Sequence, residues 1–365
     1  MSLNSTGPKR GAARLREASI GLGLVLASVA LCSFAGELLV RALSDDSRRW
    51  ELENFVTYPE RAQGRWSTMR PHPVLGWEPR PGHSDSNHGG LTFDAQGLRV
   101  HRRNARPPAV GTPPVLVMGD SYAMGEEVAD EETVPAHLQD LLDRRVLNGA
   151  VAGYGIDQMV MRAEMLVPVL RPDLLIVSFI GDDVRRSQER VLWGTEKPYF
   201  DVIGNTLTLR NVPVPQPEVR PIDAFRRIAG YSFAVDVLMA RLDLLDYWLD
   251  GQPRQRKAAH EDGRRVSCLL MDRLAGLGRA NDANVLVVAQ YTPLAWQSDS
   301  TRQFEMQDTH LVLRCAEENG LATLDTGNAV EAAVRAKNID AYYTDAHMND
   351  AGNQLTAQLI ADAVK

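Results

Sequence analysis

The sequence predicts a three-layer α/β protein, in which helices cover both faces of a parallel sheet. Short apolar runs, each long enough for one strand, lie at "VLVMG" (115–119), "VLNGAV" (146–151), "LLIVSFI" (174–180), "NVLVVAQYT" (284–292) and "LATLD" (321–325). Helical patterns follow or separate them at about 132–144, 156–169, 258–280 and 303–319, and a last helix begins near Asn349. Hydrophobicity within the runs is continuous rather than alternating. This is typical of parallel strands that are buried on both faces.

The N-terminal region predicts one helix that crosses a membrane. No residue between 18 and 36 is charged, and Lys9, Arg10, Arg14 and Arg16 precede that stretch. Such a run is long enough to span a bilayer, with its basic flank in the cytoplasm. The alternative is a cleaved signal peptide, because residues 33–35 (Ser-Phe-Ala) resemble a small-x-small cleavage site. In either case the chain beyond about residue 41 is expected outside the cytoplasm.

We therefore expect four parts: a cytoplasmic tail (1–17), a transmembrane signal-anchor (18–40), an extended lead-in segment (41–112) and the α/β domain (113–365). Residues 185–255 interrupt the strand–helix alternation as an insertion after the third strand. Within it, "KPYFDVIGNTLTLRNVPVP" predicts a β-hairpin around Gly204 and Asn205, followed by a Pro-rich loop and a helix near 223–249. Its place after a strand predicts that it overhangs the carboxyl edge of the sheet.

Composition excludes some classes of function. The formal net charge is −7, and it becomes −10 without the first seventeen residues, because four basic residues and Glu17 are removed. Such an acidic surface is unsuited to phosphate backbones, so nucleic acid is excluded as a partner. The cysteines and histidines show no metal-ligand spacing, and neither a metal nor another cofactor is expected. Cys268 and Cys315 are either small buried hydrophobic residues or a pair formed in an oxidising compartment.

Small and polar residues follow three successive strands. The first strand leads into Gly119-Asp120-Ser121, the second into "NGAVAGYGIDQ", and the third into Gly181-Asp182-Asp183. Each motif alone fits a turn that caps the next helix. Because ligands bind at the carboxyl ends of the strands in open parallel sheets, the three motifs together predict a site there.

A histidine near the C-terminus, in "YYTDAHMNDAG", completes the candidate site. A serine nucleophile needs a base to take its proton, and the base needs a partner that fixes its tautomer. His347 is the candidate base. Asp345, two residues earlier, is close enough in the sequence for its carboxylate to reach the imidazole within one loop. The alternative for this pair is an ordinary surface loop.

These motifs resemble, in order, the blocks of the SGNH hydrolases, or GDSL esterases. "GDSYAMG" resembles the first block, "NGAVAGYG" the second and "DAHMN" the last, while "GDD" stands where the third block has Asn-Asp. The resemblance covers about residues 113–365 and implies a flavodoxin-like parallel sheet. It also implies roles for individual residues: Ser121 as nucleophile, His347 as base, Asp345 as its orienting partner, the amides of Ser121 and Gly153 with Asp182 as the oxyanion hole, and Asp120, Asp183 and Asn349 as supporting residues.

Other features are similar to a membrane-tethered bacterial branch of that family. "HPVLGW", "KPYF" and the N-terminal anchor are the features shared with it, and some members are associated with O-acetyl groups on envelope polysaccharides. The resemblance implies a single-pass inner-membrane protein with its domain on the periplasmic side. An O-acylated carbohydrate or another small ester is the implied substrate, and a membrane acyltransferase is an implied partner.

One residue departs from the family pattern. Asp182 replaces the asparagine whose amide donates to the oxyanion, and an ionised carboxylate there would repel the developing charge. Asp182 could donate only if burial, together with its neighbour Asp183, kept it protonated. The leading hypothesis is a serine esterase or O-acyltransferase that works by double displacement. The alternatives are a non-catalytic glycan-binding or assembly protein and, third, a lipase or phospholipase.

Overall fold

The computed structural model describes residues 8–44, 46–56, 68–85, 90–101, 111–192, 195–215, 222–242, 244–250 and 263–365. The chain divides into two compact units. One comprises Met1–Gly64 and Val219–Gln255, and the other comprises Arg65–Glu218 and Arg256–Lys365. The second unit contains the sheet and all the candidate site residues.

The sheet has five parallel strands, which are β5 (Val115–Gly119), β6 (Val146–Asn148), β7 (Leu174–Phe179), β12 (Asn284–Ala289) and β13 (Ala322–Asp325). Their spatial order is β13-β12-β7-β5-β6. Numbered along the chain this is 2-1-3-4-5 read from the β6 edge, the flavodoxin-like order. The predicted parallel α/β fold is therefore confirmed. The order reverses between β5 and β7, so the segments that follow these two strands flank the switch point where ligands bind in such sheets.

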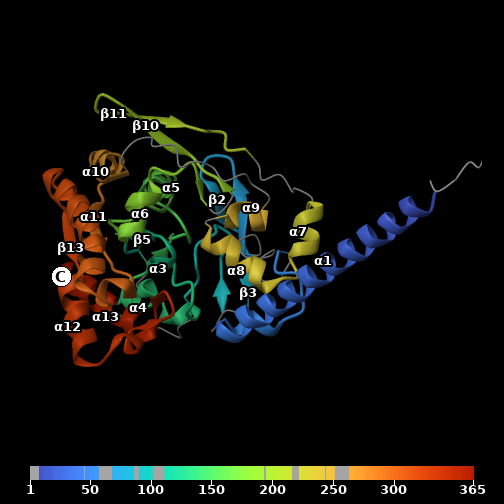
Figure 1. Ribbon diagram of the computed structural model, residues 1–365. Helices are drawn as coiled ribbons and strands as arrows, with labels where there is room; N and C mark the ends of the chain where they lie inside the picture. Colours follow the sequence, from blue (N-terminus) through green and yellow to red (C-terminus); the bar gives the residue numbers. More distant parts are fainter. Residues whose placement is uncertain are drawn as a thin grey trace, which may run out of the picture. The chain divides into compact units, whose positions relative to one another are not determined.

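Helices of the unit that contains the sheet pack in two groups (Figure 1). Helix α4 (Val134–Leu142) packs on α13 (Asp350–Ala363), whereas α10 (Gly263–Ala280) packs on both α5 (Ile156–Leu170) and α11 (Asp299–Glu318). Connections between parallel strands are right-handed, so helices that connect strands in opposite directions along the sheet lie on its opposite faces. The strand order reverses between β5 and β7, and the two groups of helices therefore give the outer layers of a three-layer fold. The strand cores, such as Ile176 and Val288, are fully buried.

Several boundaries differ from the prediction. Helix α11 begins four residues earlier than expected, because the Ser298 hydroxyl accepts a hydrogen bond from the amide of Thr301 at 3.2 Å and caps it. The expected start of α10 at residue 258 lies outside the described residues. Within the described residues of the sheet unit, three α-helices were not predicted: α3 (Ser121–Met124), α6 (Gly181–Arg186) and α12 (Gly327–Ala336).

Between Met69 and Thr92 the lead-in segment forms short antiparallel pairs. Strand β1 (Met69–His72) pairs with β2 (Gly76–Pro79), and β3 (Ser84–Asp85) pairs with β4 (Leu91–Thr92). The amide of Arg99 donates to the carbonyl of Asn148 in β6 at 2.9 Å. These residues thus belong to the same compact unit as the sheet.

The insertion contains the predicted hairpin but not the predicted single helix. Strands β10 (Tyr199–Ile203) and β11 (Thr206–Arg210) pair around a two-residue turn at Gly204 and Asn205. The stretch 223–249 forms three helices instead of one: α7 (Ala224–Ala229), α8 (Phe233–Arg241) and α9 (Leu245–Asp250). The break has a local cause, because Ser232 leaves helical geometry and caps a new helix through the amide of Val235. The hairpin and these helices also belong to different units.

The N-terminal helix α1 runs from Pro8 to Leu43. Its part Ile20–Leu43 is long and apolar enough to cross a membrane, a test that a signal sequence also passes. In the other unit, Cys268 of α10 and Cys315 of α11 form a disulfide with a Cα–Cα distance of 5.2 Å. This decides between the two alternatives left open for these cysteines.

Candidate active site

The candidate nucleophile lies on a tight turn between β5 and α3. Asp120 caps α3 by accepting a hydrogen bond from the amide of Tyr122 at 3.0 Å, and Ser121 is the first residue of the helix. The strand arrives through Gly119, where a Cβ atom would lie 2.6 Å from the carbonyl oxygen of Ser178 in β7. Only glycine fits this close approach. The turn places the Ser121 hydroxyl at the carboxyl edge of the sheet.

The candidate base reaches this hydroxyl from the end of the chain. His347 begins β15 (His347–Met348), which pairs with β14 (Tyr343–Thr344). Its Nε2 atom lies 2.9 Å from Ser121 Oγ. The structure therefore brings together a hydroxyl and an imidazole that are 226 residues apart in the sequence.

Tyr122 holds the histidine in place, a role that sequence reasoning missed. Its ring centroid lies 5.1 Å from that of His347, and its hydroxyl donates a hydrogen bond to the carbonyl of Ala346. Burial raises the pKa of the Tyr122 phenol well above its usual value, so the hydroxyl remains a donor. The signal available in the sequence was its position directly after Ser121, the candidate nucleophile.

The structure does not bring Asp345 to the imidazole, although this residue was expected to orient it. Thr344 pairs directly with His347, which leaves Asp345 and Ala346 as the two-residue turn of a hairpin. Asp345 takes a left-handed φ of +49° and is exposed, and among the described residues it forms no hydrogen bond or ion pair with His347.

Two glutamates of the loop after α3 lie beside the imidazole instead. Glu127 Oε1 is 3.0 Å from His347 Nδ1, and Glu126 Oε2 is 3.8 Å from Nε2. Glu127 and His347 are close enough to form an ion pair. The angle at Nδ1 does not suit a hydrogen bond, and this atom has no hydrogen-bond partner. A carboxylate at Nδ1 stabilises the imidazolium that forms when the histidine accepts a proton. Sequence reasoning passed over these residues because they lie far from the histidine along the chain.

Arg99 fixes the loop that carries these glutamates. Its buried guanidinium donates to the carbonyls of Met124 at 2.8 Å and Val128 at 2.6 Å, and to the carbonyl of Gly125. Its Nε atom also lies 3.1 Å from Asp130 Oδ1. An arginine buried in this way organises a loop, because its two terminal nitrogens donate to specific backbone carbonyls while Nε faces a carboxylate.

Asp182 is not the buried carboxyl that the sequence interpretation required. Its side chain is 45% exposed and forms an ion pair with Arg185 one helical turn later. Arg185 also lies 3.4 Å from Asp308 Oδ2 and 3.8 Å from Glu305 Oε1. The burial that would let Asp182 act as a donor is therefore not found in this arrangement, in which its carboxylate faces Arg185.

The buried carboxyl of this motif is Asp183. It accepts a hydrogen bond from the amide of Ile180 at 2.9 Å and from Arg186 Nη1 at 2.6 Å. The same Nη1 atom lies 3.5 Å from Asp120 Oδ2, and Ser121 Oγ lies 3.5 Å from that oxygen. Burial raises the pKa of both carboxyls, and the charge of Arg186 opposes this. One guanidinium thus links the turns that follow β5 and β7.

A third buried carboxyl, Glu305 of α11, lies beside this edge of the sheet. Its side chain is 4% exposed, and its Oε2 atom has no hydrogen-bond partner. Burial raises the pKa of Glu305 to about 7, and the negative charge of Asp182 adds to the effect. The local charge at this edge therefore changes near neutral pH.

The lead-in segment holds the loop that carries Gly153. Gly153 takes a φ of +75°, which favours glycine. On either side of it, Trp77 Nε1 donates to the carbonyl of Ala152 at 3.0 Å, and the Tyr154 hydroxyl donates to the carbonyl of Trp77. The "HPVLGW" motif is therefore a support for this loop.

Two other motifs have supporting positions. Lys197 of "KPYF" is fully buried, pairs with Asp157 and donates to the carbonyl of Arg186 at 3.0 Å, so it connects the segments after β6 and β7. Asn349 caps α13 by accepting a hydrogen bond from the amide of Gly352 at 3.1 Å. This cap fixes the chain directly after His347.

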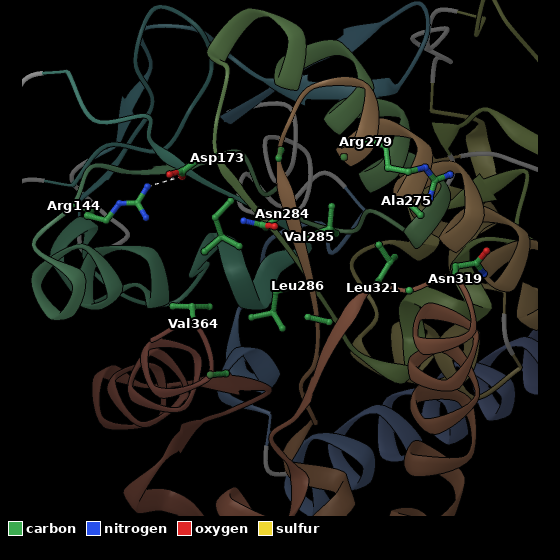
Figure 2. Close-up of a pocket in the computed structure, with 16 residues that line it drawn as sticks. Arg144, Asp173, Ala275, Arg279, Asn284, Val285, Leu286, Asn319, Leu321 and Val364 are labelled. Carbon is green, nitrogen blue, oxygen red and sulfur yellow. Dashed lines mark hydrogen bonds and ion pairs between the residues drawn. The ribbon is translucent and has the colours of Figure 1, made fainter.

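A pocket of about 610 Å³ lies at the opposite edge of the sheet (Figure 2). Leu174 and Asn284, the first residues of β7 and β12, line it together with the ion pair of Arg144 and Asp173. None of the candidate site residues lines this pocket. Among the described residues, no group of three His, Cys, Asp or Glu is arranged to hold a metal ion.

Fold and site together define an α/β protein with a serine–histidine pair at the carboxyl edge of a parallel sheet.

No family profile and no curated protein matches the chain. Several solved structures are similar to it in fold. LAE5, an alpha/beta hydrolase enzyme from the metagenome of Lake Arreo, Spain, is 16% identical with a TM-score of 0.43, over 70% of this chain and 95% of its own. Axe2, an acetylxylan esterase from Geobacillus stearothermophilus, is 14% identical with a TM-score of 0.41, over 71% and 96%. A Desulfitobacterium hafniense protein described as lipolytic and of the G-D-S-L family is 11% identical with a TM-score of 0.37, over 69% and 99%.

Proposed function

We propose that the protein is a serine esterase or O-acyltransferase of the SGNH type. The contact of 2.9 Å between Ser121 Oγ and His347 Nε2 is the observation that carries the proposal. A hydroxyl bonded to an imidazole at the carboxyl edge of a parallel sheet is the arrangement that nucleophilic acyl transfer requires.

The reaction proceeds by double displacement. His347 takes the proton of Ser121 while Oγ attacks the ester carbonyl, and the imidazolium then gives that proton to the leaving alcohol. Water or a sugar hydroxyl next attacks the acyl-enzyme while His347 accepts its proton. The bond between the acyl carbon and Ser121 Oγ then breaks, and the imidazolium returns the proton to Oγ. Glu127, at Nδ1, is the carboxylate that we propose as the partner of the imidazolium, in place of Asp345.

Two backbone amides, those of Ser121 and Gly153, are the oxyanion donors in this proposal. Asp182 does not provide the third, because its carboxylate is paired with Arg185. The lack of one donor typically lowers the rate roughly a hundred- to a thousand-fold. We therefore expect a slow enzyme rather than an inert one.

The substrate in this proposal is an O-acylated carbohydrate of the bacterial envelope, with acetyl as the acyl group and a membrane acyltransferase as a partner. Helix α1, as a signal-anchor, would hold the domain on the periplasmic face of the inner membrane. The disulfide between Cys268 and Cys315 supports that side of the membrane, because disulfides persist in oxidising compartments.

A glycan-binding or assembly protein without chemistry is the second candidate, and Asp182 is the observation that favours it. Turnover of a short-chain chromogenic ester by the detergent-solubilised full chain separates the two. An initial burst followed by slow turnover, absent in Ser121→Ala, is the expected result. Equal rates for the wild type and Ser121→Ala would refute the esterase proposal.

A further inference from the structure

Helices α7, α8 and α9 expose many large apolar side chains to solvent. Ile228 is 76% exposed, Tyr231 58% and Leu242 50%, and others of the same segment are Phe225, Leu238 and Leu245. Single exposed apolar residues are ordinary, but a group on one short segment indicates a surface that another phase or molecule covers.

The position of α8 is tied to the end of the apolar stretch of α1. Glu37, the residue directly after the uncharged run, accepts hydrogen bonds from the amides of Phe233 at 2.8 Å and Ala234 at 3.0 Å, and from the Ser232 hydroxyl at 2.6 Å. A carboxylate at a helix N-terminus is favourable for the helix dipole. Figure 1 shows α8 beside the C-terminal part of α1.

A second residue strengthens the same attachment. Arg41, one turn after Glu37, lies 2.6 Å from its carboxylate and donates to the carbonyl of Glu51 at 3.0 Å. Its guanidinium also lies 5.7 Å from the ring of Phe233. The beginning of α8 is therefore fixed to the last turns of α1 within one compact unit.

The length of the uncharged run sets the depth of this attachment. Residues 18–36 in a helix span about 28 Å, close to the roughly 30 Å hydrocarbon thickness of a bilayer. Glu37 then lies at the outer boundary of the hydrocarbon, and the start of α8 lies there with it. Aromatic residues are enriched at that level, and Tyr231 and Trp50, which is 57% exposed, both belong to this unit.

We infer that α7, α8 and α9 form a membrane-bound surface whose apolar side chains enter the boundary between headgroups and acyl chains. The inference rests on the proposed membrane anchor. The occupant is phospholipid, because the surface is continuous with the end of a membrane-spanning helix. Arg227 and Arg241 are exposed on the same helices and suit anionic headgroups.

The test uses the full chain with Cys32→Ala, reconstituted in vesicles of phosphatidylethanolamine and phosphatidylglycerol. Single cysteines at Ile228, Tyr231 or Leu242 carry an environment-sensitive fluorophore, and Val169→Cys, at a residue of α5 that is 72% exposed, is the matched control. The first three labels are expected about 5–10 Å into the boundary between headgroups and acyl chains. Lipids brominated near the headgroup should therefore quench roughly half of their emission. The same lipids should quench little of the emission of the control label.

Each other outcome overturns a different statement. Vesicles that float with the protein while all labels stay unquenched would overturn the membrane-bound surface but keep the anchor. Labels with blue-shifted emission that bromine leaves unquenched would mean that protein, such as a second copy, covers the surface. Absence of flotation would overturn the anchor and the inference together. Ester turnover in the same vesicles reports separately on Ser121.

Discussion

The ring of Tyr122 packs against the ring of His347, and its hydroxyl binds the carbonyl of Ala346 beside it. The residue after Ser121 therefore holds His347, so the two groups that we propose to react share one short support. A proton donor and acceptor that are positioned in advance need little reorganisation when the reaction begins.

Replacement of Ser121, the proposed nucleophile, gives the first prediction. Ser121→Ala should abolish ester turnover, since no other hydroxyl is known to contact His347 in the described structure. The melting temperature should change by only about a few degrees, because the substitution removes one oxygen and leaves the turn intact. Turnover and thermal unfolding of the same preparation check both statements. Retained turnover in this variant would show that Ser121 is not the nucleophile.

Two carboxylates compete as the partner of the imidazole. Glu127→Gln should lower kcat roughly 10- to 100-fold. This loss is smaller than the roughly 10⁴-fold loss that follows replacement of the buried carboxylate in a catalytic triad, because solvent screens a side chain that is one-third exposed. Asp345→Asn is the matched control and should leave kcat nearly unchanged. Steady-state kinetics of both variants decide the matter, and the reverse order of effects would restore Asp345 to the role.

The third prediction concerns the oxyanion. Asp182→Asn removes a negative charge and adds an amide donor, so turnover should rise, up to roughly a hundred-fold. Arg185 loses one partner in this variant but keeps its contact with Asp308. Comparison of kcat at several pH values checks this, with Asp299→Asn, an exposed exchange at the start of α11, as the control for charge alone. A slower Asp182→Asn enzyme would mean that the Asp182–Arg185 pair itself assists the reaction.

Glu305 predicts a dependence of stability on pH. Its pKa of about 7 lies above the value in an unfolded chain, so the folded state retains this proton longer as pH rises. The protonated form contributes about 3 kcal/mol to the free energy of unfolding. This contribution is complete below about pH 4.5 and is lost as pH rises through 7. Glu305→Gln should therefore be more stable than the wild type at pH 8 and similar to it at pH 5.

Thermal unfolding at the two pH values measures this difference. Glu318→Gln, an exposed exchange on the same helix, is the control and should show no such dependence. Parallel pH profiles for the wild type and Glu305→Gln would contradict the raised pKa.

The sequence allowed the fold to be predicted more fully than the site. Continuous apolar runs are a local signal, and they located all five strands because burial on both faces leaves no polar alternation. The partner of His347 is not a local feature. Asp345 lies only two residues before it in the sequence, yet the direct pairing of Thr344 with His347 places Asp345 in an exposed turn. Glu127 comes from a loop more than two hundred residues earlier.

The surroundings of Asp182 could not be predicted for a related reason. Sequence position could not show which of two adjacent aspartates faces the interior. On α6 the two side chains point in different directions, so Asp183 meets Arg186 in the core and Asp182 meets Arg185 near solvent. Burial, and with it the raised pKa, belongs to the second aspartate.

Trp77 and Arg99 have a consequence for how small a working version of this protein can be. A fragment that began at Val115 would retain every strand of the sheet and both reacting side chains. It would lose the indole that holds the carbonyl of Ala152 and the guanidinium that holds the loop of Glu127. Such a fragment could fold and still lack the proposed activity, so the smallest unit expected to be competent begins at or before Trp77, well ahead of the first strand of the sheet.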